Sequence, residues 1–277
     1  MTEQNTNRQV GDNIIDVKNL VKKFGKQLAV DNVSFEVKHG KVFAFLGPNG
    51  AGKTTTIRML TTMLHPTSGT VRLNGYDPVH ESNETRKSFG IVFQDASLDN
   101  ELTAYENMKF HAVLYNVPKE IYTPRIEELM KLVELWDRRK EYVKNFSGGM
   151  KRRLEIARGL LHHPKVLFLD EPTLGLDPQT RNKIWDYIRN LNQKEGLTVF
   201  FTTHYMQEAD RYAEKIAIID HGKIVASGSS EELQKQTGKE TLEDAFLALT
   251  GTQIRDEAGG AIDRMRVHRK AWGGGRN

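Results

Sequence analysis

The chain has 277 residues, of which 38% are hydrophobic and 27% are charged, and it contains no cysteine. This length and apolar content allow one sizeable domain or two modest ones, each with a buried core. The lack of cysteine excludes disulfides, thiolate metal sites and cysteine nucleophiles, and it fits a reducing compartment. No run approaches the roughly 18 to 20 apolar residues of a membrane helix, and the polar start lacks the apolar core of a secretory signal. These features predict a cytoplasmic protein.

The formal net charge of +4 is unevenly distributed along the sequence. The segment 251–277 holds six Lys or Arg residues and three acidic residues, so the remaining chain is nearly neutral. The high isoelectric point therefore reflects a basic C-terminal tail and not a DNA-binding face, and we expect no nucleic-acid partner. The tail could lie on a membrane surface, pack against a second copy of the chain, or be solvated.

Short apolar runs that are typical of buried strands recur along the chain. They lie at residues 14–17, 33–37, 42–46, 70–73, 90–93, 166–169, 198–202 and 216–219. Helical patterns separate several of these runs, which favours a buried and largely parallel sheet. The sequence therefore predicts the α/β fold class.

A helical insert is predicted at about residues 96–162. No good strand occurs at 101–144, and apolar residues recur there at helical spacing. Thr103 followed by Glu106 forms the capping-box pattern of a helix start. Pro118 and Pro124 are predicted to lie in the turns that follow this helix.

Residues 47–54 read GPNGAGKT, which fits the phosphate-loop pattern G-x-x-x-x-G-K-[ST] between an apolar run and a plausible helix. The glycines let backbone N–H groups curl around phosphates, and the helix N-terminus adds partial positive charge. Lys53 is expected to neutralise the outer phosphates and Thr54 to hold Mg²⁺. The alternative is a glycine-rich turn that binds no ligand. The predicted nucleotide-binding residues of this segment are Gly47, Pro48, Asn49, Gly50, Ala51, Gly52, Lys53, Thr54 and Thr55.

An acidic pair, Asp170 and Glu171, follows the apolar run 166–169. Carboxylates at the end of a buried strand are costly unless a cation or a reaction uses them. We expect Asp170 to orient the Mg²⁺ shell and Glu171 to polarise the attacking water. Taken alone, such a pair is more often a helix cap or a loop, but the phosphate loop reverses that preference.

Three further segments occur in a fixed order, namely NFSGGMKRRLEIARGLLHHP, VLFLDEPTLGLDP and VFFTTHYMQEAD. With GPNGAGKT and the glutamine of IVFQD, they closely resemble the motifs of the ATP-binding subunits of ABC transporters. The resemblance covers about residues 14–251. It implies a P-loop NTPase core with a mostly parallel sheet, an antiparallel β subdomain and a helical subdomain. We expect the ATP-binding domain to span 14–250 and the basic tail to span 251–277.

The resemblance assigns a signature turn to Ser147, Gly148 and Gly149, which would reach the γ-phosphate of an ATP held by a partner subunit. The turn directly precedes an apparent helix, whose N-terminus suits anionic oxygens. From the residues alone, this turn would be an ordinary helix cap. The family usually has leucine before the serine and glutamine after the glycines. Phe146 and Met150 stand there instead, and Met150 lacks an amide that could hydrogen-bond in a closed dimer.

Four more residues match positions of the family. Gln94 corresponds to the Q-loop glutamine that senses Mg²⁺ or water, and His204 to the switch histidine that contacts the γ-phosphate and steadies the catalytic carboxylate. Asp177 corresponds to the D-loop, which crosses between subunits, and Phe24 to an aromatic that stacks on adenine. Without the resemblance, Gln94 would be a polar residue that leaves a strand, and His204 would be a structural histidine. Asp177 would be a helix cap, and Phe24 would be a core aromatic.

The resemblance implies an ATPase with ATP and Mg²⁺ as cofactors, in which the phosphate loop of one chain and the SGG turn of another complete each site. One chain carries every motif, so a homodimer could hold two competent sites, while a heterodimer stays possible. The transport partner would be a separate membrane subunit that docks near residues 94–105 and holds the ATPase at the cytoplasmic face of the membrane.

Weaker similarity, after Gln94 and in the segment TLEDAFLALTG, points to the drug-resistance and polysaccharide-export branch, whose membrane subunits are of the ABC-2 type. This implies export. The alternative is a soluble ABC ATPase that acts on nucleic acid or ribosomes. Translation-factor ATPases normally carry two copies of the motif set, and repair ATPases have a long coiled coil where this chain has about a hundred residues. A regulatory module without hydrolysis is disfavoured because Glu171 and His204 are both present.

Overall fold

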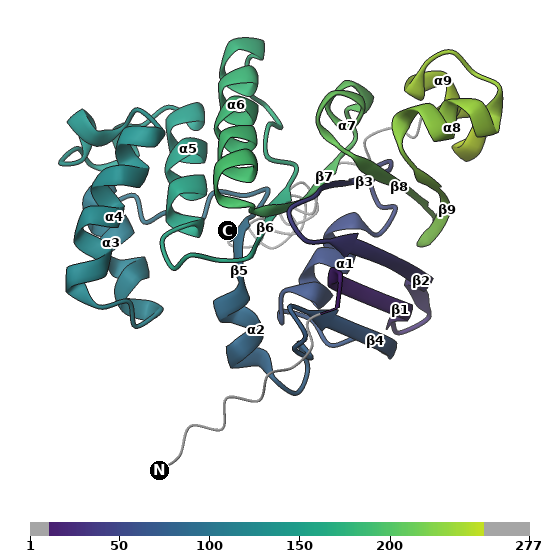
Figure 1. Cartoon of the computed structure of the whole chain (residues 1–277), viewed down its shortest axis with the longest axis horizontal. Coiled ribbons are helices and arrows are strands. Elements are labelled where there is room, and N and C mark those ends of the chain that lie inside the picture. Colours follow the sequence, from purple (N-terminus) through teal and green to yellow (C-terminus); the bar gives the residue numbers. More distant parts are fainter. Residues whose placement is uncertain (1–10, 252–277) are drawn as a thin grey trace, which may run out of the picture.

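The computed structural model describes residues 11–251, whose strands form two sheets (Figure 1). A three-stranded antiparallel sheet has the order β2-β1-β4, and a six-stranded sheet has the order β5-β6-β7-β3-β8-β9. In the larger sheet, only β9 pairs antiparallel to its neighbour. The strands are β1 Asn13–Phe24, β2 Gln27–Lys38, β3 Val42–Leu46, β4 Ser68–Leu73, β5 Phe89–Val92, β6 Val166–Asp170, β7 Thr198–Thr203, β8 Lys215–Asp220 and β9 Lys223–Gly228.

Helices connect these strands and cover the larger sheet. Figure 1 shows α1 beside the antiparallel sheet, whereas α3, α4 and α5 form a block on the β5 side of the six-stranded sheet. The helices are α1 Lys53–Leu60, α2 Ser82–Ser88, α3 Ala104–Leu114, α4 Lys119–Leu132, α5 Gly148–Gly159, α6 Pro178–Glu195, α7 Met206–Tyr212, α8 Ser230–Thr237 and α9 Leu242–Thr250, with 3-10 turns η1 Trp136–Arg138 and η2 Val143–Asn145.

The six-stranded sheet separates two hydrophobic cores, because successive strand residues face opposite sides. Phe43, Phe45 and Phe200 face the antiparallel sheet and α1, where their rings pack against Phe35 and Phe168. The intervening residues of the same strands face the core built by the helical insert and α6. Every residue of β3, β6 and β7 is buried, as expected for parallel strands covered on both faces. The ends of these strands are therefore fixed in position.

The predicted α/β fold is confirmed, with a mostly parallel sheet, an antiparallel β subdomain and helices in the insert. Each apolar run that was predicted to be a strand overlaps a strand of the structure. The capping box is also confirmed, because Thr103 accepts a hydrogen bond from the Glu106 amide and the Glu106 side chain accepts one from the Thr103 amide.

The position of Pro124 was predicted wrongly. Pro118 does precede a helix, as the residue before α4, but Pro124 lies inside that helix and not in a turn. A proline there removes the bond to the Glu120 carbonyl, four residues earlier. Both residues are exposed, so water can solvate the freed carbonyl and the helix continues.

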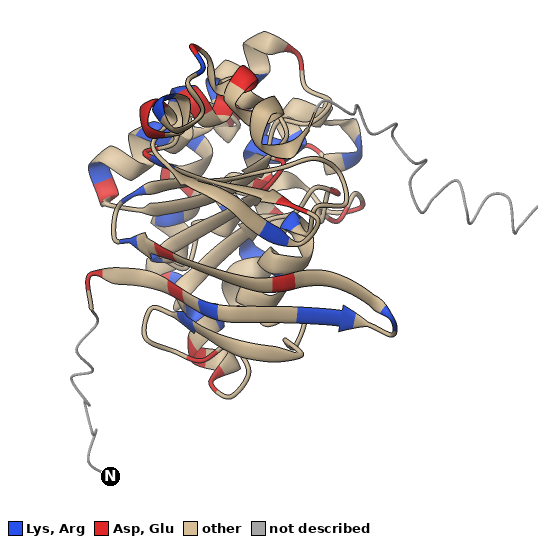
Figure 2. Ribbon diagram, turned by 90° about the vertical axis from the view of Figure 1, so that its right-hand side faces the viewer, with Lys and Arg blue, Asp and Glu red and all other residues tan. Residues whose placement is uncertain are grey.

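Charge is mixed over the described chain. In the view of Figure 2, basic and acidic residues are interspersed along the ribbon. Among residues 11–251, no helix combines the length and apolar content needed to cross a bilayer. The predicted basic tail lies outside the described residues.

Two half-buried histidines join the helical insert to the β5 side of the large sheet. The His162 ring stacks on Tyr115, with ring centres 4.0 Å apart, and its Nε2 donates to the carbonyl oxygen of Phe89 at 2.9 Å. His111 packs against the same tyrosine, and neither His111 Nε2 nor His162 Nδ1 has a hydrogen-bond partner. Burial lowers the pKa of His111 to about 3, helped by the charge of Arg158, and burial lowers that of His162 to about 4.

These histidines should make the fold sensitive to acid. Between pH about 6.5 and about 4, the unfolded chain binds protons that the folded chain excludes, so the free energy of unfolding falls as the pH falls. His111→Gln removes one such group. Between pH 6.5 and pH 5, the free energy of unfolding of this variant should therefore fall by about 1 to 2 kcal/mol less than that of the wild type. Urea unfolding at both pH values measures this. The exposed His65 provides the control, since His65→Gln should follow the wild-type pH dependence, and equal slopes for all three proteins would contradict the assignment.

Candidate active site

Four of the predicted motifs follow neighbouring strands at one edge of the large sheet. Asp170 at the end of β6 pairs with Thr202 of β7, and Leu46 at the end of β3 pairs with Thr203 of β7. On the other side of β6, Val92 of β5 pairs with Leu169. Because the carboxyl ends of parallel strands meet at one edge, the phosphate loop, the acidic pair, the switch histidine and the Q-loop all start there.

The phosphate loop connects β3 to α1, and two of its glycines are required by close packing. A Cβ at Gly47 would lie 2.3 Å from the carbonyl oxygen of Ile219, and a Cβ at Gly52 would lie 2.6 Å from that of Ala29. Gly52 also has φ of 109°, which disfavours other residues. The loop is thus held between β2 and the end of β8. Its helix begins at Lys53, and the first amides of a helix have no partner within it, so they are available to phosphate oxygens.

Lys53 lies almost completely buried at the start of α1. Its Nζ donates to the carbonyl oxygens of Gly47 at 2.7 Å and Pro48 at 3.2 Å, and it lies 3.2 Å from Oε1 of Glu171. Burial lowers the pKa of Lys53, and the charges of Glu171 and Asp170 only partly oppose this effect. The ammonium group therefore lies inside the phosphate loop, in contact with the Glu171 carboxylate.

The acidic pair is fixed by the backbone and by a threonine of β7. Asp170 is buried, and its Oδ1 accepts a hydrogen bond from the Thr202 hydroxyl at 2.6 Å. The amide of Glu171 donates to the same hydroxyl at 3.0 Å. Glu171 has φ of 49°, an uncommon left-handed conformation for a residue other than glycine. This turn separates the two carboxylates, so that each can have a different role.

The Glu171 carboxylate lies between two groups from other elements. Oε1 faces Lys53, and Oε2 lies 3.3 Å from Nδ1 of His204, which follows β7. This contact joins the end of β7 to the carboxylate that follows β6. Burial raises the pKa of Glu171, but His204 and Lys53 together outweigh that effect and hold the pKa below its usual value. Glu171 is therefore ionised at neutral pH, as a group that polarises water must be.

Gln94 is less constrained than the acidic pair. Its side chain is exposed, and the structure gives that side chain no hydrogen bond to another described residue. Its backbone carbonyl oxygen accepts a hydrogen bond from Arg152 of α5 at 2.9 Å. The structure therefore places Gln94 at the correct edge of the sheet without bringing its amide to Asp170.

The signature turn packs against the D-loop of the same chain. The Ser147 hydroxyl accepts a hydrogen bond from the Met150 amide at 3.3 Å and thereby caps α5. A Cβ at Gly149 would lie 2.5 Å from the methyl group of Thr180, so a larger residue there would require the Thr180 side chain to move. Asp177 caps α6 by accepting from the Thr180 amide at 3.0 Å. Within the described chain, no hydrogen bond or ion pair connects Ser147 to the phosphate loop.

Phe24 ends β1, at the turn that leads into β2. Its ring is 48% exposed, so the alternative of a core aromatic is wrong. Nζ of Lys22 lies 5.1 Å from the ring centre. The following strand passes the phosphate loop at Ala29, which brings this hairpin to the same side of the molecule as the loop.

Several residues of the site were not identified from the sequence. Thr202 bridges Asp170 and the Glu171 amide, as described above. Glu208 of α7 is buried and accepts hydrogen bonds from the hydroxyl groups of Thr173 and Thr203, the latter at 3.0 Å. The two threonines at the end of the apolar run TVFFTT were the available signal, since hydroxyl groups buried in a strand need partners.

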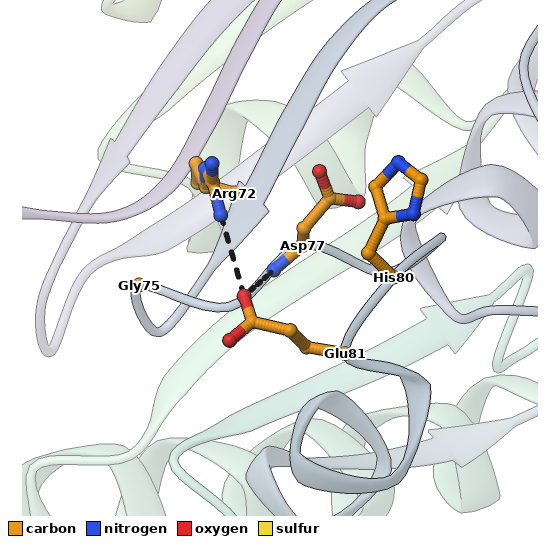
Figure 3. A pocket seen from close by; sticks show the side chains of 5 residues that line it. All are labelled: Arg72, Gly75, Asp77, His80 and Glu81. Atoms are coloured by element: carbon orange, nitrogen blue, oxygen red, sulfur yellow. Dashed lines mark hydrogen bonds and ion pairs between the residues drawn. The ribbon is translucent and has the colours of Figure 1, made fainter.

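A hollow of 460 Å³ lies elsewhere, between β4 and α2 (Figure 3). It is lined by Arg72, Gly75, Asp77, His80 and Glu81. Oε2 of Glu81 accepts hydrogen bonds from Arg72 at 3.4 Å and from the Asp77 amide at 3.0 Å. Glu81 is therefore already paired with two of the lining residues, and the motif residues belong to other elements. We assign no part of the nucleotide site to this hollow.

Comparison with known proteins identifies the family. The family model described as ABC transporter matches residues 30–174. The daunorubicin/doxorubicin resistance ATP-binding protein DrrA of Streptomyces peucetius is 43% identical, over 88% of this chain and 73% of its own length. The linearmycin resistance ATP-binding protein LnrL of Bacillus subtilis is 39% identical, over 83% of this chain and 73% of its own.

Solved structures agree with this result. A dimeric ATP-binding cassette in a post-hydrolysis state, bound to ADP and Pi, is 29% identical and superposes with a TM-score of 0.70. The match covers 78% of this chain and 98% of that cassette. The chain therefore belongs to the ATP-hydrolysing subunits of ABC transporters, in the exporter branch that includes drug-resistance ATP-binding proteins.

Proposed function

We propose that two copies of this chain close around two ATP molecules, and that opening and closing of this dimer drives export through a separate membrane subunit of the ABC-2 type. The observation that carries the proposal is the placement of Glu171, whose ionised carboxylate lies between Lys53 and His204 at the end of the phosphate loop. This arrangement supports hydrolysis at the γ-phosphate. Phe24, exposed on the neighbouring hairpin, is available to stack on the adenine.

The residues at the sheet edge fit ATP with Mg²⁺. The loop from Gly47 to Thr55 offers backbone amides and the Lys53 ammonium to the phosphates. Mg²⁺ would be held by the Thr54 hydroxyl, Asp170 and Gln94, and it would neutralise charge on the phosphate oxygens. Asp170 suits this role, because a buried carboxylate at a strand end is costly without a nearby cation.

The chain's own groups account for the proton that the attacking water loses. Glu171 is ionised at neutral pH and can accept this proton or orient the water. His204 lies 3.3 Å from the same carboxylate, so it can limit the directions in which Glu171 points. The His204 side chain is 30% exposed, so its ring could also meet a polar group of the bound nucleotide.

The signature turn supports a site shared between two chains. Ser147, Gly148 and Gly149 form the N-terminus of a helix of 12 residues, which favours anionic oxygens. Ser147 makes no hydrogen bond or ion pair with the phosphate loop among the described residues, so its phosphate partner is assigned to a second copy. The related cassette of known structure is itself dimeric.

A membrane subunit would dock beside the Q-loop, at about residues 94–105. The side chains of residues 94–97 are exposed there. The adjacent helix α3 exposes three large apolar side chains, Phe110, Val113 and Leu114, whose spacing places them on one face. Exposed apolar groups that gather on one helix face are typical of protein interfaces. This docking would hold the ATPase peripherally at the cytoplasmic face of the membrane.

The names of the relatives suggest the kind of cargo. Two of them confer resistance to daunorubicin and doxorubicin or to linearmycin. We therefore propose that the exported compound is a lipophilic antibiotic or a molecule of similar character. The choice of cargo would lie in the membrane subunit, because the described chain contributes a nucleotide site and a docking face.

Glu171→Gln tests the catalytic assignment. The change keeps the size of the side chain but removes the group that activates water, so ATP binding should persist while hydrolysis falls by about a hundredfold or more. Nucleotide titration and phosphate release measure the two effects. Glu214→Gln is the matched control, because Glu214 pairs with Lys41 at the opposite edge of the sheet and should leave turnover unchanged. Near-normal hydrolysis by the Glu171 variant would overturn the assignment.

Ser147→Arg tests the shared site. The large cation should prevent the signature turn from approaching a partner's nucleotide, so ATP still binds but no longer produces dimers in sedimentation experiments. Ser229→Arg is the control for the lost helix cap, because Ser229 caps α8 in the same way. Both variants should lose about 1 kcal/mol of unfolding free energy from capping. Only the Ser147 variant should lose dimerisation, and an ATP-dependent dimer of that variant would contradict the model.

A further inference from the structure

The backbone of the Q-loop is bound to one face of the signature helix α5. Arg152 donates hydrogen bonds from its guanidinium to the carbonyl oxygens of Phe93 and Gln94, the latter at 2.9 Å. Glu155 accepts from the amide of Ser97 at 2.6 Å and from the Ser97 hydroxyl at 3.1 Å. Arg158 donates to the carbonyl oxygen of Ser97 at 2.8 Å and also to its hydroxyl. The contacts therefore hold both ends of residues 93–97.

This cluster is buried although the segment that it holds is exposed. Arg152 is 7% exposed and Glu155 is 1% exposed, and the two side chains pair at 3.2 Å. Buried ion pairs contribute little net stability compared with apolar packing, because the desolvation cost offsets their attraction. Their consequence here is geometric, since the guanidinium fork fixes two consecutive carbonyl groups relative to the helix axis.

The same helix begins at the signature turn. Ser147 caps α5, and Arg152 follows five residues later, which corresponds to about 7 to 8 Å along the helix axis. A helix of this length moves as a rigid element. A displacement of the signature turn must therefore be transmitted through Arg152 to the carbonyl group of Gln94.

We propose that Arg152 and Glu155 are positioning residues, which set the place of Gln94 in its own ATP site according to the position of the signature turn in the partner's ATP site. The inference rests on the proposed function, in which Gln94 and Ser147 of one chain belong to different nucleotides. Each chain then carries a polar connection between the two ATP sites. Gln94 reaches its Mg²⁺ position only when α5 has moved to close the neighbouring site.

Arg152→Met tests this connection, because methionine keeps much of the apolar bulk and removes both donors. We expect the rate at saturating ATP to fall by roughly tenfold to a hundredfold, as for a misplaced catalytic group, with the KM for ATP almost unchanged. The Mg²⁺ concentration that gives half the maximal rate should rise as well. Arg153→Met is the matched control, because the adjacent Arg153 contacts Val133 and Glu134 and not the Q-loop.

A double-mutant cycle with Gln94→Ala separates a positioning role from a general loss of structure. If Arg152 acts through Gln94, its substitution should change the rate less than twofold in the Gln94→Ala background. Arg152→Lys, which keeps the charge but lacks the two-pronged donor, should give an intermediate rate and provides the readout if the methionine variant unfolds. Thermal unfolding of each variant identifies such a loss.

The results distinguish this inference from the proposed function. Should Glu171→Gln abolish hydrolysis while Arg152→Met and Arg152→Lys keep the wild-type rate and Mg²⁺ dependence, the inference is wrong and the proposed function stands. Equal rate losses for Arg152→Met in the wild-type and Gln94→Ala backgrounds would also overturn it. Wild-type turnover by Glu171→Gln would instead overturn the proposed function itself.

Discussion

One buried carboxylate joins the parts of the site. Glu171 directly follows β6, a strand whose residues are all buried, and its charge would be strongly destabilising there without compensation. Lys53 from the phosphate loop and His204 from the end of β7 provide that compensation from two separate elements. The loop, the acidic strand and the switch histidine therefore form one electrostatic unit, and the pKa of Glu171 is low because all three are in place.

The phosphate loop and the two carboxylates are held rigidly by one core, whereas the Q-loop beside them is held less tightly. Aromatic rings of β3, β6 and β7 pack together on one face of the sheet, with centroid separations of 5.3 to 5.8 Å around Phe200. Dense packing of this kind fixes the strand ends that carry the phosphate loop and the carboxylates. The Q-loop is attached differently, since polar side chains of α5 hold its backbone near the surface. Movement within the site is therefore expected between the sheet edge and α5.

The sequence predicted those parts of the fold that depend on local pattern. Fully buried parallel strands appear as short apolar runs, so β3, β6 and β7 could be recognised. Strand β9 was missed because its segment KIVASG has only two buried residues and pairs with one neighbour at the side of the sheet, so it lacks the continuous apolar run of a central strand. Pro124 was placed in a turn because a proline normally interrupts a helix. The helix continues through it because the freed carbonyl is exposed to water, which depends on the tertiary fold.

The same distinction applies to the site. The motifs located Lys53, Asp170 and Glu171 because each of these residues lies in a short run of neighbouring residues that can be recognised in the sequence. Thr202 and Arg152 were not identified, because their roles arise from contacts between segments that are 32 and 58 residues apart in the chain. A threonine in a strand or an arginine on a helix has no local pattern that reveals which distant carbonyl or carboxylate it meets.

A second buried carboxylate extends the unit toward the D-loop. Glu208 accepts hydrogen bonds from Thr173, which lies two residues after Glu171, and from Thr203, which lies directly before the switch histidine. Arg181, in the first turns of α6, lies 3.6 Å from the same carboxylate. A movement of the D-loop at the start of α6 must therefore disturb the group that supports both sides of Glu171. The geometry of Glu171 thus depends on the start of α6, which the proposed dimer would bring against a second copy.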